Sequence, residues 1–457
     1  MTTFPGIFRL RQTFDVAHIE DVPAEVHSQL ARLDLGKKIR AGQTVAITAG
    51  SRGIANVAAI TRAIVENLES LGARPFIVPA MGSHGGGTAD GQRQLLESLG
   101  ITEQSVGCPI RSSTETVVVG SLSCGAAVSA APAGGTPAPQ FALGDCPDFR
   151  AGENGLVPFA PGQGFPLHFD RLAFEADHVL ICNRVKPHTS FAGPIESGLL
   201  KMLTIGLGNP EGATTYHRAM LDFGFDRIVR RAAAEVLARG RILAGVAVVE
   251  NAYDQTARIE AVPPEQFEVR ESELLALGRR LLPRLPFSDG AVLLIDRIGK
   301  EISGTGMDPN VVGCKFNDHR AVEDEFPKVK RIAVRSLTPQ SHDNATGIGM
   351  AKFCRTQLLA QIDVAATRLN ALTSGHVSAA MLPLDYPTDR QMLTAAFTAI
   401  GLTAPPQARF LWIPDTLHLA ELECSVAYFA EARQRRDLEI LTEPHDLPFD
   451  STGNLPP

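Results

Sequence analysis

Apolar and polar positions alternate between two periods along the first part of the chain. Residues 44–48 form a short apolar run, which is typical of a buried strand, and apolar residues within 57–71 recur at helical spacing. A second strand at 75–79 leads to a second helix that carries the leucines of 95–99. Strand, helix, strand and helix with short links predict a parallel sheet with helices on its faces.

The same kind of pattern continues further along the chain. A first unit is completed by strands at 177–182 and 243–249 and by a helix at 218–237. A helix then runs into a linker that contains Pro283 and Pro286. A second unit follows, and its predicted elements are strands at 291–296, 331–334 and 409–412 and helices at 350–362 and 391–400.

The sequence therefore predicts an α/β protein of two domains, with the active site in the cleft between them. The larger N-terminal domain, at 1–275, has a parallel sheet, and the smaller C-terminal α/β domain occupies 288–430. Residues 431–457 form a polar tail that we expect to pack back as an extended arm. The stretch 121–164 is rich in Ala, Gly and Pro and has little periodicity, so we interpret it as an irregular insertion or a lid.

Composition argues against several classes of function. With 43 Lys and Arg against 50 Asp and Glu, the formal charge is −7, and the sequence offers no basic patch to a nucleic acid. No stretch approaches the roughly 20 apolar residues that span a bilayer, and the start of the chain lacks the apolar core of a signal peptide. The seven cysteines are scattered and include no C-x-x-C, which indicates reduced thiols. We therefore expect a cytoplasmic protein with no nucleic acid or membrane partner, while the oligomeric state stays open.

Several common catalytic motifs are absent from the sequence. It contains no G-x-x-x-x-G-K-[ST], H-E-x-x-H or G-x-S-x-G, so phosphoryl transfer, zinc proteolysis and serine hydrolysis lack their usual signatures. The glycines Gly206 and Gly208 do not continue into a dinucleotide fingerprint. An ordinary NAD-dependent enzyme is therefore not supported.

Five polar residues stand on or near loops that follow predicted strands: Arg52, His84, His188, Lys201 and His217. In parallel sheets, ligands bind at the loops that leave the carboxyl ends of strands. Two histidines, with an ordinary pKa of about 6.5, can act as general base and general acid. Arginine presents a planar fork to a carboxylate or phosphate, and lysine is a latent nucleophile or covalent anchor. Each residue alone has an ordinary structural explanation, such as a cap or a surface charge, but together they indicate a catalytic site.

These residues resemble those of the nickel-pincer-nucleotide racemases and epimerases, the family typified by lactate racemase. The resemblance extends over most of the chain. It rests on AGSRG at 49–53, MGSH at 81–84 and VKPH at 185–188, and on the 16-residue separation of Lys201 and His217, which matches the family's spacing.

The resemblance implies a role for each residue. Lys201 would be linked covalently to the nickel-pincer nucleotide, a pyridinium mononucleotide with a thioamide and a thiocarboxylic acid, and His217 would ligate the nickel. His84 and His188 would be the catalytic acid/base pair. The other predicted contacts are Gly50, Ser51, Arg52 and Glu196 to the cofactor, and Arg52, Lys300 and Lys315 to the substrate. Glu196 could hydrogen-bond the cofactor ribose or a catalytic histidine, although a glutamate near a helix start is also favoured by the helix dipole.

The resemblance also implies the reaction, which is racemisation or epimerisation of a 2-hydroxy acid. Removing the proton from carbon 2 would create a carbanion beside a carboxylate, whereas transient hydride transfer to the cofactor avoids that carbanion. One histidine would take the hydroxyl proton, and the other would act on the oxygen when hydride returns to the opposite face. A small 2-hydroxy acid would be the ligand, and proteins that synthesise the cofactor would be partners.

The chain departs from the lactate racemase pattern at three places. Ala49 stands where those enzymes have an aspartate, and the interval between His188 and the lysine that follows it is longer than theirs. The family's second-domain lysine has two candidates here, Lys300 and Lys315, on either side of a loop at Thr305–Asn310 that could close over the substrate. These differences put lactate itself in doubt as the substrate.

Two other functions fit the same residues. His84, His188 and His217 could surround a different metal in a redox or hydrolytic enzyme. Alternatively, the chain could keep a nucleotide or small-acid pocket and catalyse nothing, as a sensor or carrier.

Overall fold

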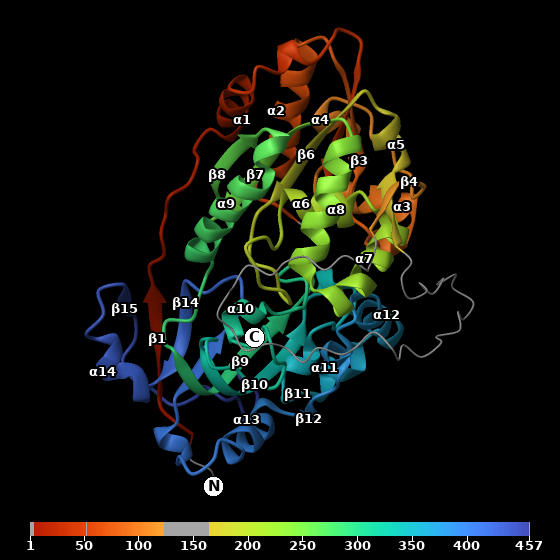
Figure 1. Cartoon of the computed structure of the whole chain (residues 1–457). Coiled ribbons are helices and arrows are strands. Elements are labelled where there is room, and N and C mark those ends of the chain that lie inside the picture. Colours follow the sequence, from red (N-terminus) through yellow and green to blue (C-terminus); the bar gives the residue numbers. More distant parts are fainter. Residues whose placement is uncertain (1–3, 52, 123–163, 457) are drawn as a thin grey trace, which may run out of the picture.

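The computed structural model describes residues 4–51, 53–122 and 164–456. Nearly all of the predicted insertion at 121–164 lies outside the described residues, as does Arg52. The described chain folds into two large sheets with helices packed on them, together with a two-stranded sheet formed by β4 (Thr116–Leu122) and β5 (Phe165–Asp170) (Figure 1). The predicted α/β fold class is therefore confirmed.

The first large sheet has five strands in the order β3-β2-β6-β7-β8. All neighbours are parallel except β7 and β8, so the sequence predicts the parallel sheet correctly. Its inner strands are almost continuously buried because helices cover both faces. The bounds are Thr44–Ala49 for β2, Arg74–Pro79 for β3, His178–Arg184 for β6, Ile242–Glu250 for β7 and Thr256–Val262 for β8.

This sheet separates two hydrophobic clusters. β2 sends Val45 and Ile47 into one cluster and Ala46 into the other, because side chains alternate along a strand. Apolar residues of α1 (Val22–Ala31) and α2 (Val57–Ser70) complete the first cluster.

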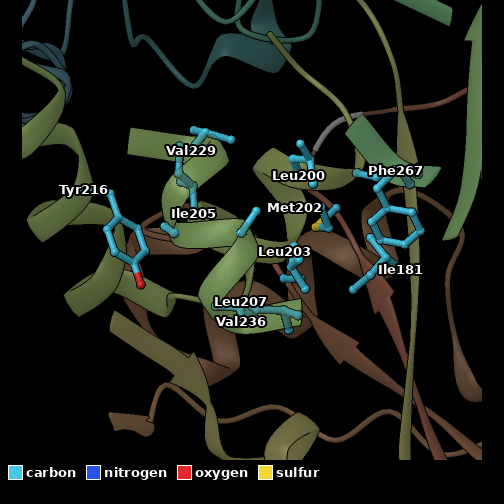
Figure 2. Packing of buried hydrophobic residues seen from close by; sticks show 14 of the residues in the cluster. Ile181, Leu200, Met202, Leu203, Ile205, Leu207, Tyr216, Val229, Val236 and Phe267 are labelled. Atoms are coloured by element: carbon cyan, nitrogen blue, oxygen red, sulfur yellow. The ribbon is translucent and has the colours of Figure 1, made fainter. Parts of the chain in front are cut away.

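The second cluster surrounds the chain that precedes and follows Lys201. Leu200, Met202 and Leu203 pack there with residues of the sheet and of α9 (Phe267–Leu281). Figure 2 shows these three side chains together with Phe267. Burial of the neighbours on both sides fixes the backbone from which the Lys201 side chain leaves.

The second large sheet has eight strands in the order β12-β11-β10-β9-β13-β14-β1-β15. The block from β12 to β13 is parallel, and the remaining strands are antiparallel. The bounds are Asp289–Ile298 for β9, Lys328–Leu337 for β10, Phe353–Arg355 for β11, Leu384–Tyr386 for β12, Phe410–Ile413 for β13, Glu421–Ser425 for β14 and Leu438–Ile440 for β15.

The N-terminal strand belongs to this second sheet, although the predicted division groups residues 1–275. β1 (Ile7–Gln12) lies between β14 and β15, and its side chains Phe8 and Leu10 are fully buried in the second sheet's core. The predicted tail at 431–457 packs back on the same strand, through β15 and through a bridge between Ile7 and His445. Periodicity within a segment cannot reveal such partners, because they are distant in the sequence.

Two predicted helices differ from those in the structure. The helix predicted at 218–237 is two helices, α7 (Asn209–Phe223) and α8 (Phe225–Arg239), separated by Gly224 with a φ of +80°. The helix predicted at 350–362 starts later, as α11 (Thr356–Gln361), because the preceding residues join the sheet as β11. The other helices are α3 (Ala89–Ser98), α4 (Glu103–Val106), α5 (Arg171–Glu175), α6 (Leu199–Lys201), α10 (Pro309–Val312), α12 (Val364–Ser374), α13 (Asp389–Thr398) and α14 (Phe429–Ala432). No helix in the described ranges combines the length and apolar character needed to cross a bilayer.

Candidate active site

Several of the predicted site residues meet at one edge of the first sheet. Gly50 and Ser51 follow β2, His84 follows β3 and His188 follows β6, and these three strands are parallel neighbours. From this edge the chain leaves β2 toward β3 and leaves β6 toward β7, so the connections diverge. Ligands of open α/β sheets bind at such a switch point.

His84 presents an unprotonated ring nitrogen. Its Nδ1 lies 2.7 Å from the carbonyl oxygen of Met81. A carbonyl only accepts hydrogen bonds, so Nδ1 carries the proton and Nε2 keeps its lone pair in the neutral ring. The side chain is exposed and stands before the turn Gly85–Gly87. His84 can therefore accept a proton through Nε2.

His188 is held in the opposite tautomer. The backbone N–H of Ser190 donates to His188 Nδ1 at 3.0 Å, so the neutral ring carries its proton on Nε2. Burial, followed by the charges of Lys201 and Lys315, holds the pKa of His188 well below its ordinary value. The ring centroid lies 4.8 Å from that of Phe191. His188 is therefore neutral at physiological pH and can donate a hydrogen bond from Nε2.

The loop that carries His188 is closed by a short bridge and centred on a buried carboxylate. Lys186 and Ser197 exchange backbone hydrogen bonds of 2.9 and 3.3 Å at its two ends. Within it, Glu196 is fully buried and accepts from the backbone N–H of His188 at 2.5 Å and from Arg279 at 2.6 Å. Glu196 thus hydrogen-bonds a predicted catalytic histidine, through its backbone, and holds the histidine loop, while the contact of Glu196 with the cofactor stays a prediction.

The two candidate lysines of the second domain have different surroundings. Lys315 is nearly buried, and its Nζ lies 2.9 Å from Glu196 Oε2. Lys300 instead donates to the Gly304 carbonyl at 3.1 Å and to Asn370 Oδ1 at 2.8 Å. Of the two, Lys315 is therefore the one that the structure brings to the His188 loop.

The Thr305–Asn310 loop also reaches the first sheet's loops. Asn310 Nδ2 donates to the carbonyl oxygen of His188 at 3.1 Å. The sequence suggested that this loop approaches the site, but only the fold identifies Asn310 as the contact. Its own position is fixed by Asp308, which accepts from the Asn310 backbone at 2.9 Å.

Lys201 ends α6 and is followed directly by a π-helical turn at Met202–Gly206. Single π-helical turns are rare and are found frequently at functional sites. Upstream of Lys201, the α9 residue Glu271 accepts from the Leu200 backbone N–H at 2.8 Å. A Cβ at Gly198 would lie 2.4 Å from the Glu271 carboxyl carbon, so a larger residue there would displace the Glu271 side chain. Sequence patterns did not indicate Glu271 because its partner is 71 residues away.

His217 lies inside α7 rather than before a helix, as the predicted boundary implied. Burial, followed by the charge of Lys201, lowers its pKa to about 4, although the Ala213 carbonyl opposes part of this shift. Its Nδ1 is buried and makes no hydrogen bond within the described part of the chain. A buried imidazole nitrogen without a partner is unusual in a folded protein, and metal coordination is one of the explanations.

Three lysines share the surroundings of the two histidines. The pKa of His188 is lowered by burial and then by Lys201, Lys315, His217 and Lys186, and Lys201 also acts on His217. Lys201 therefore lies within electrostatic range of both histidines, whereas Lys186 and Lys315 lie within range of His188, and Lys315 is also paired with Glu196, so that basic groups predominate in this cluster. Such a cluster favours an anionic ligand, and among the described residues no three His, Cys, Asp or Glu side chains are placed to hold a metal ion by themselves.

No protein-family model matches the chain, and the comparison with curated proteins gives no match either. Among solved structures, the chain is similar to the lactate racemase apoprotein from Thermoanaerobacterium thermosaccharolyticum, with a TM-score of 0.46 and 12% sequence identity. The alignment covers 89% of this chain and 94% of that chain. A likeness at this identity and TM-score carries no conclusion about activity.

The buried Glu271 predicts a pH dependence of stability. Burial raises the pKa of Glu271 from 4.5 to about 7, so the native state binds a proton that the unfolded state releases between these values. Its contribution to stability is complete below about pH 4.5 and falls as the pH rises through 7, by on the order of 3 kcal/mol. Urea unfolding at pH 5 and pH 8 should therefore show Glu271→Gln gaining stability relative to wild type at the higher pH. Glu265→Gln, at an exposed position, is the control, and a pH-independent difference for Glu271→Gln would contradict the expectation.

The ion pair between Lys315 and Glu196 should stabilise the contact between the second domain and the His188 loop. Lys315→Met leaves a buried carboxylate with Arg279 as its remaining charged partner, which should cost about 1–3 kcal/mol. Urea unfolding measures this loss. The exposed Lys38→Met serves as the control and should change stability by less than about 0.5 kcal/mol. Equal effects of the two substitutions would contradict this account.

Proposed function

We propose that this protein is an isomerase that racemises or epimerises a 2-hydroxy acid with a nickel-pincer nucleotide bound at Lys201. The observation that carries the proposal is the placement of Lys201 within electrostatic range of His217, whose buried Nδ1 has no hydrogen-bond partner among the described residues. The residue for covalent attachment, the residue for metal coordination and one acid/base candidate thus share one cluster.

The residues present fit this cofactor. A histidine with a pKa of about 4 is neutral at physiological pH, so its lone pair is available to a metal without releasing a proton. Imidazole is a suitable ligand for nickel. His217 needs to supply only one metal-ligating atom, because the nucleotide carries its own sulfur and carbon ligand atoms. When bound, the cofactor would supply a transient acceptor for the hydride of carbon 2. Gly50, Ser51 and Arg52 stay predicted cofactor contacts.

The two acid/base histidines would have distinct tasks at the substrate oxygen. His84 Nε2 has a lone pair and can take the hydroxyl proton. His188 carries a proton on Nε2 and can donate a hydrogen bond to the oxygen of the keto acid. The lysines around His188 would attract the substrate carboxylate, and Lys315 is the candidate on the second domain.

Cofactor attachment is testable without turnover. Protein purified from cells that make the nickel-pincer nucleotide should contain nickel and should show an adduct mass on the peptide that includes Lys201. Lys201→Met should lose the adduct because the attachment amine is gone, and His217→Asn should keep the adduct but lose most of the nickel. Lys38→Met is the matched lysine control. Absence of both nickel and adduct from the wild-type protein would refute the cofactor assignment.

The roles of His84 and His188 are tested by chiral chromatography with a panel of 2-hydroxy acids. His84→Ala and His188→Ala should each reduce isomerisation by about 10²- to 10⁴-fold while the adduct on Lys201 remains, because each removes one proton-transfer or hydrogen-bonding group. His445→Ala, at an exposed position, is the control and should retain activity. Full activity in either site variant would remove that histidine from the mechanism.

A further inference from the structure

A cavity of about 430 Å³ opens in the second sheet and shares no residue with the cluster around Lys201. Its lining consists of Asp296, Arg297, Arg335, Ser336, Arg355 and Gln357, with Pro414 at one side. Three arginines around a space of this size suit a small charged molecule, since ligand sites begin at about 300 Å³.

The cavity lies at a position where sheets of this kind bind ligands. Asp296 and Arg297 stand near the carboxyl end of β9, and Pro414 follows β13, its parallel neighbour. From β9 the chain continues to β10 on one side, whereas from β13 it continues to β14 on the other. The connections therefore diverge between β9 and β13, as they do between β2 and β6 in the first sheet, and this divergence defines a switch point.

The arginines of the cavity differ in how many of their N–H groups already donate hydrogen bonds to the protein. All five N–H groups of Arg335 have acceptors, which are two carboxylates, Asp296 and Asp389, and two backbone carbonyls of the C-terminal segment. Arg297 is about half exposed and uses only Nε, which donates to Asp415 at 3.1 Å. Its two terminal nitrogens make no hydrogen bond to the described residues, so this planar fork is available to a ligand.

Arg355 and Asp296 offer further groups that the protein leaves unused. The Nε of Arg355 is buried and finds no acceptor among the residues that the structure covers. Asp296 accepts from Arg335 and Trp412 through Oδ1 alone, with both distances at 2.7 Å. Its Oδ2 accepts no hydrogen bond from the described chain. The cavity thus combines arginine donors for an oxyanion with one carboxylate oxygen that needs a donor.

We propose that this cavity is a second binding site, which takes a small oxyanion that also carries a hydroxyl group. The oxyanion meets the Arg297 fork, and the hydroxyl donates to Asp296. Carboxylate and phosphate both match an arginine fork, so a hydroxycarboxylic acid and a small phosphate ester are the two sources of this chemistry. The proposal does not depend on the proposed isomerase function, because none of its residues belongs to the Lys201 cluster.

Isothermal titration of the cofactor-free full chain tests the proposal, with glycerate as the carboxylate probe and glycerol 3-phosphate as the phosphate probe at constant ionic strength. At least one probe should bind saturably at a site that persists in Lys201→Met, whether or not glycerate, which is a 2-hydroxy acid, also binds at the first cluster, and the comparison shows which oxyanion is preferred. Arg297→Met should weaken that binding at least tenfold, since it removes the free fork. Arg280→Met, which changes an exposed arginine on α9, should leave it unchanged.

Two further variants show whether the probes bind in this cavity or elsewhere. Gln357→Leu changes an exposed residue of the cavity wall without breaking an ion pair and should also weaken binding, which covers the case in which Arg297→Met fails to fold. Lys201→Met separates this site from the first cationic cluster and should leave the affinity unchanged. Saturable binding by neither probe, binding that Arg297→Met and Gln357→Leu leave intact, or binding lost only in Lys201→Met would overturn the proposal.

Discussion

Glu196 is a carboxylate with no exposed side-chain surface, and burying such a charge is costly unless partners surround it. Its partners come from three parts of the chain: the histidine loop itself, α9 through Arg279, and the second domain through Lys315. Because each partner satisfies part of one buried charge, the three parts are held in a single arrangement. The backbone position of His188 therefore depends on this carboxylate, while its ring also contacts Ser190, Phe191 and Phe225.

The same helix that supplies Arg279 also fixes the segment of Lys201. α9 presents Glu271 to the backbone of Leu200, the residue before the lysine, so one helix positions both the histidine loop and the lysine segment. Burial, reinforced by Lys201, keeps both His188 and His217 neutral, which is the state in which imidazole can bind a metal or exchange hydrogen bonds with a neutral substrate group. Packing therefore fixes the positions of these side chains and is also the main cause of their lowered pKa values.

Sequence patterns predicted the elements of this structure that are determined by residues close together in the chain. The parallel strands β2, β3, β6 and β7 of the first sheet were predicted because burial on both faces makes them short, continuous apolar runs, whereas the antiparallel edge strand β8 was not predicted. The polar residues that follow β2, β3 and β6 were found because loops after parallel strands share one edge. The α7 start at Asn209 was missed, since its first turns are polar and contain a proline and a glycine, which resemble a loop.

Other features could not be predicted because they depend on distant partners. The longer interval after His188 looked like a departure from a family pattern, but it contains Glu196 and Gly198, whose functions appear only when α9 packs beside them. The neutral state of the two histidines likewise follows from their burial, together with the charge of Lys201, which the fold brings near both. No single segment carries that information.

The placement of β1 has a consequence for the order in which the molecule can form during synthesis. Arg11 and Glu421, which pair across β1 and β14, are 410 residues apart in the chain. The first sheet has all its strands by Val262, so it can assemble while the ribosome is still translating the second. β1 cannot pair until β14 and β15 have been synthesised, and closing so long a loop is an intrinsically slow step. Until then, the edges of β14 and β15 stay open to other chains.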